Sequence, residues 1–267
     1  MTPMATAIDP VCEMEVEMES AVATSVYKGQ RYCFCAPGCK VTFDEDPERY
    51  LRRKGVATST PSVAAQPMPG SAVELTVTLP VDRAIRTRRS VARLKPDPVP
   101  REAIERMLEA AVWAPNHHLT EPWEFVVLTG EAKRLFAEIR RDFRRTLFKN
   151  PSAAEIQPAL EKIYADTVHT PVIIAVTTTA PDDPALRDDD YAATMCAIHN
   201  MLLMATGLGL GTYLRTGGFI HHGPLLRFLG VPTGRRIAGI VYVGYPDHVP
   251  ERRRTPATMK TRWMGSR

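Results

Sequence analysis

The 267-residue sequence has no long hydrophobic run. Its most apolar stretches, 172–176 and 237–243, have the length of strands and fall well below the roughly 18 residues that suggest a transmembrane helix. Residues 1–10 contain no basic segment followed by an apolar one, so no secretory signal is predicted. No run of like charge is longer than three residues, which disfavours a nucleic-acid-binding tail. We therefore expect a soluble, cytoplasmic protein that binds neither membrane nor nucleic acid.

Several catalytic motifs are also missing. The sequence has no Gly-x-Ser-x-Gly elbow, no P-loop and no His-Glu-x-x-His helix, which disfavours the hydrolase, nucleotide-cleaving and zinc-protease chemistry that these motifs carry. The net charge is −2 over residues 1–54 and +6 over residues 55–267. A basic excess of that size suits an anionic cofactor as well as a nucleic acid.

Cysteine is scarce except at one end. Four of the five cysteines lie in the first 40 residues, at Cys12, Cys33, Cys35 and Cys39, and only Cys196 lies beyond them. Such clustering without a secretory signal indicates metal or redox chemistry more than a secreted disulfide framework. Soft sulfur ligands favour Zn, Cu(I) or Fe. The alternative is that these are small buried thiols in an apolar core.

The cysteine-rich segment is separated from the rest by a linker. Residues 55–73 contain no charged or aromatic residue and three prolines, too little bulk to build a core. We predict a small module over 8–54, a flexible linker over 55–77 and a main domain over 78–267. The module is expected to form a hairpin around the turn at 27–30, followed by one short helix over 39–51.

The main domain alternates helical and strand patterns, which predicts an α+β fold. The expected helices cover 100–113, 131–148, 151–166 and 188–208, and the expected strands cover 125–128, 172–178 and 237–244. Helix 188–208 is apolar on nearly all sides, so we expect it in the core or at a dimer interface. The acids at 188–190 suit a helix N-terminus better than a hard-metal site.

Two polar segments are candidate site elements. Arg88, Arg89 and Ser90 offer guanidinium forks and a hydroxyl that match a phosphate, although a solvated basic turn has the same composition. The loop 114–123 is bracketed by prolines and carries His117 and His118. Adjacent histidines in a loop usually diverge, so a metal site there is not predicted.

The small module resembles the YHS domain. The resemblance rests on Asp-Pro-Val-Cys-Glu-Met at 9–14 and Tyr-Cys-Phe-Cys-Ala-Pro-Gly-Cys at 32–39, with Glu13 and Cys33 departing from the family pattern. It implies metal binding through Cys12, Cys35 and Cys39, with Zn, Fe or Cu as the metal. Cys33 either joins that site or forms a local disulfide with Cys35.

The main domain resembles the nitroreductase family of FMN-dependent oxidoreductases. The match comes from Arg-Arg-Ser at 88–90, Ala-Pro-Asn-His at 114–117 with Glu-Pro-Trp at 121–123, the glycine-rich stretch 207–211 with Arg-Thr-Gly at 215–217, and Gly-Tyr-Pro at 244–246. It is most similar to the small-nitroreductase branch. The resemblance implies a nitroreductase-like α/β sandwich, a homodimer, FMN as cofactor and NAD(P)H as co-substrate.

The resemblance also assigns roles to residues. Those that match FMN contacts are Arg88, Arg89, Ser90, His117, Glu121, Leu214, Arg215, Thr216, Arg252 and Arg254. Glu121 departs from the family's Gln, and a carboxylate cannot donate a hydrogen bond as an amide does. Gly207 and Gly209 lie in a stretch that we interpret as close packing near the flavin, with a nicotinamide contact in the resembling branch.

The implied reaction passes hydride from NAD(P)H through the flavin to a nitroaromatic, quinone or enone acceptor. The flavin does the chemistry, so no catalytic side chain is predicted. Two alternatives stay open. One is a flavin enzyme for a single metabolite, of the dehalogenase or synthase type, and the other is a metal or redox sensor that uses the flavin domain as a scaffold. Exchange of electrons between metal and flavin is an open question at this point.

Overall fold

The chain forms two compact units. The computed structural model describes residues 6–11, 15–18, 21–34, 37–52, 79–251 and 253–265. The first unit is Met1–Glu74 together with Asn116–Glu121, and the second is Leu75–Pro115 with Pro122–Arg267. The predicted linker 55–77 lies outside the described residues. No helix in the described part of the chain is long and apolar enough to cross a membrane.

The first unit contains two small antiparallel sheets and two short helices. Strand β1 (Thr6–Ile8) pairs with β2 (Glu15–Glu17), and β3 (Ala23–Tyr27) pairs with β4 (Gln30–Phe34). The β3–β4 hairpin turns at Lys28 and Gly29, whose φ angles are 50° and 79°, as a two-residue type I′ turn requires. Helices α1 (Pro37–Glu45) and α2 (Pro47–Arg52) follow.

The predicted single helix 39–51 is therefore wrong. Pro47 has no N–H to donate and begins a new helix, so the pattern that looked continuous is split into α1 and α2. The helices and the β3–β4 hairpin enclose a small core. Its buried members are Val11, Phe34, Cys39, Phe43 and Tyr50.

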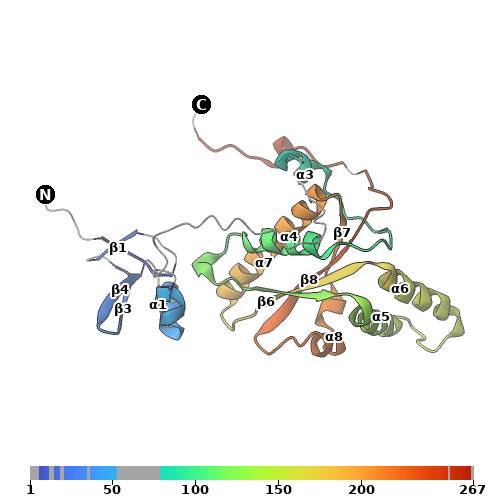
Figure 1. The fold of residues 1–267 in the computed structure, drawn as a ribbon, viewed down its shortest axis with the longest axis horizontal. Coiled ribbons are helices and arrows are strands. Elements are labelled where there is room, and N and C mark those ends of the chain that lie inside the picture. The colour runs from blue at the N-terminus through green and yellow to red at the C-terminus, as the bar shows by residue number, and fades with distance from the viewer. Residues whose placement is uncertain are drawn as a thin grey trace, which may run out of the picture. The chain divides into compact units, whose positions relative to one another are not determined.

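The second unit is built on a four-stranded sheet in the order β5-β6-β8-β7 (Figure 1). The strands are β5 (Trp123–Leu128), β6 (Val172–Thr179), β8 (Arg235–Gly244) and β7 (Gly211–Arg215), and all neighbours are antiparallel. Strand β6 is buried from 172 to 178, which fits its β-branched sequence and central place. The predicted strands are confirmed, while β7 was not predicted.

Helices cover both faces of this sheet (Figure 1). On one face, α4 (Arg101–Val112) and α7 (Pro184–Gly207) pack Met107 and Met201 against Ile174 of β6. On the other face, Phe136 and Leu225 pack against Ile173. The elements of that second face are α5 (Gly130–Arg145), α6 (Gln157–His169), α8 (Gly223–Phe228) and the 3₁₀ turn η4 (Gly218–His221). The expected α+β sandwich is confirmed.

Short helical segments complete the second unit and the loop 116–121. They are α3 (Val81–Thr87), η2 (His117–Leu119), η3 (Ala154–Ile156) and η5 (Ala257–Lys260). The helix predicted over 151–166 is in fact η3 followed by α6, which runs on to His169.

Helix α7 begins earlier than predicted. Its first residue is Pro184, where the Asp183 carboxylate accepts a hydrogen bond from Ala185 N at 2.8 Å, so the acids 188–190 do not form its N-terminus. One side of the helix lies in the core, where Met201 is fully buried, and the other side is exposed in the single chain at Cys196 and His199, so a dimer interface there stays a prediction.

Candidate functional site

A short strap of chain runs along the free edge of the sheet. After α3, residue Ser90 forms a parallel bridge with Thr212 of β7, and Val91 N donates to Thr212 O at 2.8 Å. Leu94 bridges Pro246 just beyond β8. The predicted motif 88–90 is therefore held beside β7 by backbone pairing, which leaves its side chains free to point away from the sheet.

The strap borders a cavity of about 500 Å³, which we call the Arg89 cavity. Its lining is rich in basic groups and contains no acid: Arg89, Ser90, Ala92, Arg93, Tyr213, His248, Pro250 and Arg254. Two hydrogen bonds orient the Arg89 side chain, in which its Nη1 donates to Arg86 O at 2.6 Å and to Arg88 O at 2.9 Å. Arg252, predicted for the same role as Arg254, lies outside the described residues.

Arg88 belongs to the same group of positive charges. Burial lowers the pKa of its guanidinium, and the charges of Arg254 and Arg89 lower this pKa further. Among the described residues, no carboxylate forms an ion pair with Arg88, Arg89, Arg93 or Arg254. A group of cations that repel one another without a counter-ion is suited to an anion, and guanidinium forks match a phosphate.

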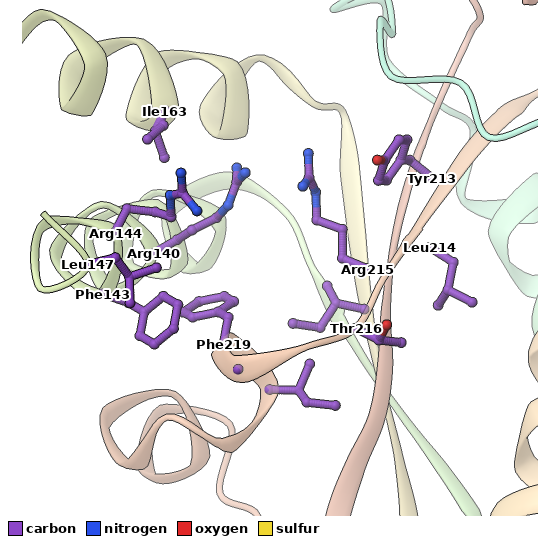
Figure 2. A pocket seen from close by; sticks show the side chains of 13 residues that line it. Arg140, Phe143, Arg144, Leu147, Ile163, Tyr213, Leu214, Arg215, Thr216 and Phe219 are labelled. Atoms are coloured by element: carbon purple, nitrogen blue, oxygen red, sulfur yellow. The ribbon is translucent and has the colours of Figure 1, made fainter.

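A second cavity, of about 750 Å³, lies on the α5 side of β7 and we call it the Arg215 cavity. Tyr213 lines both cavities, so they lie next to each other. The predicted residues Leu214, Arg215 and Thr216 all line the second one (Figure 2). The Arg215 guanidinium lies 4.6 Å from the ring centre of Tyr213, and its buried Nε has no hydrogen-bond partner.

The groups that line the two cavities can be compared with the groups that FMN would present to them. A phosphate would satisfy the unpaired arginines of the Arg89 cavity, and the neighbouring Arg215 cavity offers space and an unpartnered Nε for the polar ring system. The donor set therefore fits this cofactor.

The loop with His117 and Glu121 is grouped with the first unit. Its backbone is left-handed at His118, Leu119 and Glu121, with φ of 57°, 52° and 44°, and Glu121 N donates to Asn116 Oδ1 at 3.0 Å. The expectation that the two histidines diverge is wrong. Their rings stack with centres 3.7 Å apart, because the left-handed turn at His118 folds one ring over the other. Neither His117 nor Glu121 lines the two cavities.

The glycine-rich stretch divides into different roles. Gly207 ends α7. Gly209 has a φ of 75° and no neighbour within 4 Å of an added Cβ, so its positive φ, and not close packing, is the reason for a glycine at this position. Close packing holds instead at Gly211, where a Cβ would lie 3.0 Å from Leu94 Cδ2 and 3.1 Å from Val91 Cβ.

Of the three predicted metal ligands, only Cys39 lies in the described part of the chain. It is fully buried on α1, and within the first unit its Sγ lies 3.1 Å from His118 Nδ1. Cys12 and Cys35 lie outside the described residues. The described residues contain no group of three or more side chains that could hold a metal. Cys33 is a free thiol, which argues against its disulfide with Cys35.

The structure adds residues that the sequence did not assign. Arg93 and His248 line the Arg89 cavity, and Arg140 and Arg144 line the Arg215 cavity. Arg93 belongs to the basic run 86–93, which was the signal in the sequence that could have pointed to it. The basic face of α5 was visible in the sequence, but nothing in it showed which arginines face a cavity.

Comparisons with known proteins agree with this geometry. The profile of the nitroreductase family matches residues 85–245, and that of the YHS domain matches residues 7–54. The chain belongs to the nitroreductase family. It carries a YHS domain at its N-terminus and is a nitroreductase-type enzyme.

Two relatives illustrate the family match. The "Putative NAD(P)H nitroreductase YfhC" of Bacillus subtilis is 33% identical over 174 residues, which are 64% of this chain and 88% of that protein. The crystal structure of a nitroreductase-like family protein from Bacillus cereus is 30% identical with a TM-score of 0.61, covering 72% of this chain and 99% of that one.

A second structure contains FMN. A nitroreductase-type protein from Desulfovibrio desulfuricans in complex with FMN is 25% identical with a TM-score of 0.54, covering 70% of this chain and 98% of that one. The chain thus shares its fold with a protein that binds FMN.

Proposed function

We propose that the protein is an FMN-dependent oxidoreductase that takes hydride from NAD(P)H and reduces a nitroaromatic, quinone or enone. The observation that carries the proposal is the group of unpaired arginines around the Arg89 cavity, directly beside the Arg215 cavity at the free edge of the sheet. The family membership and the FMN-bound relative support it.

The chain's own residues would bind and tune the cofactor. Arg88, Arg89, Ser90 and Arg254 would hold the phosphate, with Arg252 as a further predicted contact. Leu214, Arg215 and Thr216 would lie beside the flavin ring. A guanidinium there stabilises negative charge as it develops on a reduced flavin. When bound, FMN supplies the hydride chemistry itself.

The remaining predicted contacts belong to the same proposal. His117 and Glu121 are proposed as further FMN contacts, and Gly207 and Gly209 as nicotinamide contacts. The donor and the acceptor would use one site in turn, since both must reach the flavin.

Two further features extend the proposal beyond the flavin. The exposed side of α7, with Cys196 and His199, would form part of a homodimer interface. In the YHS domain, Cys39 would bind Zn, Fe or Cu together with Cys12 and Cys35. Its thiol is buried beside an imidazole, and both groups are ligands that such metals accept.

The phosphate assignment is tested by Arg88→Ala and Arg254→Ala, with Arg253→Ala as the matched control. Arg253 neighbours Arg254 but does not line the cavity. Loss of a charge-assisted contact should weaken FMN binding by about 2 kcal/mol, or roughly 30-fold in Kd, measured by fluorescence quenching of added FMN. The control should stay within about 2-fold.

The stability of the apoprotein gives a second measurement, in which Arg88→Ala should not have the unfavourable effect that it has on FMN binding. Because burial and like charges lower the pKa of Arg88, its charge is unfavourable in the FMN-free fold. Arg88→Ala should therefore not lower the free energy of unfolding of the apoprotein while it weakens FMN binding. Unchanged FMN retention in both Arg88→Ala and Arg254→Ala would overturn the assignment.

A further inference from the structure

The Arg215 cavity carries a second group of arginines. Arg140 and Arg144 of α5 and Arg215 of β7 all line it, and no acidic side chain is found among the described residues of its lining. In Figure 2 the three arginine side chains reach toward the same side of the cavity, while the rings of Phe143 and Phe219 lie on the other side.

In the described part of the chain, none of these three cations forms an ion pair with a carboxylate. Arg140 is held in place by a hydrogen bond to the Thr167 hydroxyl, and its guanidinium lies 5.5 Å from the ring centre of Tyr242. Burial is the largest cause that lowers the pKa of Arg140, and the charges of Arg215 and Arg144 lower this pKa further, while Tyr242 and Asp166 raise it.

The aromatic side of the cavity is preorganised. The ring centres of Phe143 and Phe219 lie 5.2 Å apart, and Phe219 also packs against buried Phe136 at 5.6 Å. The planes of Phe143 and Phe219 are tilted by 43°, so the two rings provide an apolar wall with edges and faces that an aromatic ligand can contact. The cavity therefore combines a cationic side with an aromatic side.

The phosphate of FMN cannot neutralise both arginine groups. FMN carries one phosphate, and the proposed function places it at the Arg89 cavity. With Arg215 beside the flavin ring, Arg140 and Arg144 are then left for an anionic group on the ligand that exchanges electrons with the flavin. A carboxylate is the group that guanidinium forks match best on a small aromatic molecule.

We propose that the Arg215 cavity selects aromatic acceptors that carry a carboxylate, with Arg144 and Arg140 as the specificity-determining residues. This inference rests on the proposed function, since it needs the flavin beside Leu214–Thr216. Arg144 is the more exposed of the two and can meet an incoming carboxylate, whereas Arg140 is anchored deeper by Thr167.

The test compares 4-nitrobenzoate with its neutral analogue 4-nitrobenzamide. Binding to the full chain saturated with FMN is measured by calorimetry for wild type, Arg144→Gln and Arg145→Gln. Arg145 is the next residue of α5 and does not line the cavity. We expect Arg144→Gln to weaken 4-nitrobenzoate binding roughly tenfold and to change 4-nitrobenzamide binding less than about twofold. Arg145→Gln should change neither.

Steady-state turnover distinguishes a failure of the acceptor-selecting site from a failure of the proposed oxidoreductase function. If the FMN-loaded protein reduces both acceptors equally well and Arg144→Gln alters neither Kd, the inference is overturned while the proposed function stands. If 4-nitrobenzoate binds as expected but neither acceptor, nor a quinone or an enone, is reduced, the proposed function fails and the anion site remains. A variant that raises only the KM for NADH or NADPH assigns the arginines to the nicotinamide phosphates and overturns the acceptor assignment.

Discussion

Gly244 offers a direct test of how the edge of the sheet is packed. It ends β8 opposite Gly211 of β7. A Cβ at this position would lie 2.8 Å from Pro171 Cδ and 3.1 Å from Leu94 Cβ. Neither atom is the end of a flexible side chain, so the backbone of one neighbour must move when Gly244 is replaced by Ala.

The cost follows from these distances. Carbon atoms pack best at about 3.5–4.0 Å, so at least one contact must open by several tenths of an ångström. Overpacking of this kind typically costs about 1–3 kcal/mol. Alanine has less conformational freedom than glycine in the unfolded chain, and this difference offsets about 0.4–1 kcal/mol of the overpacking cost. We expect Gly244→Ala to lower the free energy of unfolding by about 1–2 kcal/mol.

The assay is urea unfolding of the apoprotein followed by tryptophan fluorescence. All three tryptophans, Trp113, Trp123 and Trp263, belong to the second unit, and the buried Trp123 begins β5, so the change in signal on unfolding reports the second unit. The control is Gly223→Ala, where the nearest atom to a Cβ is the mobile Arg227 Nη1 at 3.4 Å, and its change should stay within about 0.5 kcal/mol. Equal effects of the two substitutions would refute the packing argument.

Three further predictions concern other parts of the chain. Met201→Ala should lower the free energy of unfolding by about 2–5 kcal/mol, because Met201 is fully buried between α7 and the sheet, whereas Cys196→Ala on the exposed side of α7 should have little effect in the same urea assay. Cys39→Ser should remove the metal found by elemental analysis and Cys196→Ser should not, and equal metal content in the two variants would contradict the proposed role of Cys39 as a metal ligand. Burial lowers the pKa of Lys133, so the unfolded chain holds this proton to higher pH than the fold. Wild type should therefore gain stability over Lys133→Met as pH rises toward the ordinary lysine pKa of 10.5, and a difference that is constant or shrinks as pH rises would contradict it.

The elements predicted best from the sequence are those with strong local patterns. The β-branched run of β6 and the periodic apolar face of α4 appear where expected. Strand β7 was missed because its five residues follow a glycine-rich stretch, and its strand conformation depends on pairing with β8, which is distant in sequence. The true start of α7 was marked by Asp183 followed by Pro184, a capping residue and a first-turn proline that outweigh the later acids.

The candidate site was predictable only in part. Arg89, Ser90 and Arg254 line one cavity and Leu214, Arg215 and Thr216 line the other. These assignments came from motif resemblance, since nothing in the spacing of 90 and 254 places them together. The sequence could not show that Arg140 and Arg144, rather than the other arginines of α5, line a cavity. Which side of a basic helix lies against the cavity depends on how the helix packs on the sheet.

The register of β7 links the packing of the edge to the chemistry of the site. Successive side chains of a strand point to opposite faces, so Tyr213 packs with the α5 side and Leu214 with the α7 side. Arg215 therefore lies on the α5 side, against the rings of Tyr213 and Tyr242. A slip of one residue would turn Arg215 into the apolar core beneath α7, at a high cost for an unpaired charge. Close approach at Gly211 and Gly244 favours the observed register. The two small residues thus help to place a guanidinium in the cavity, although neither lines it.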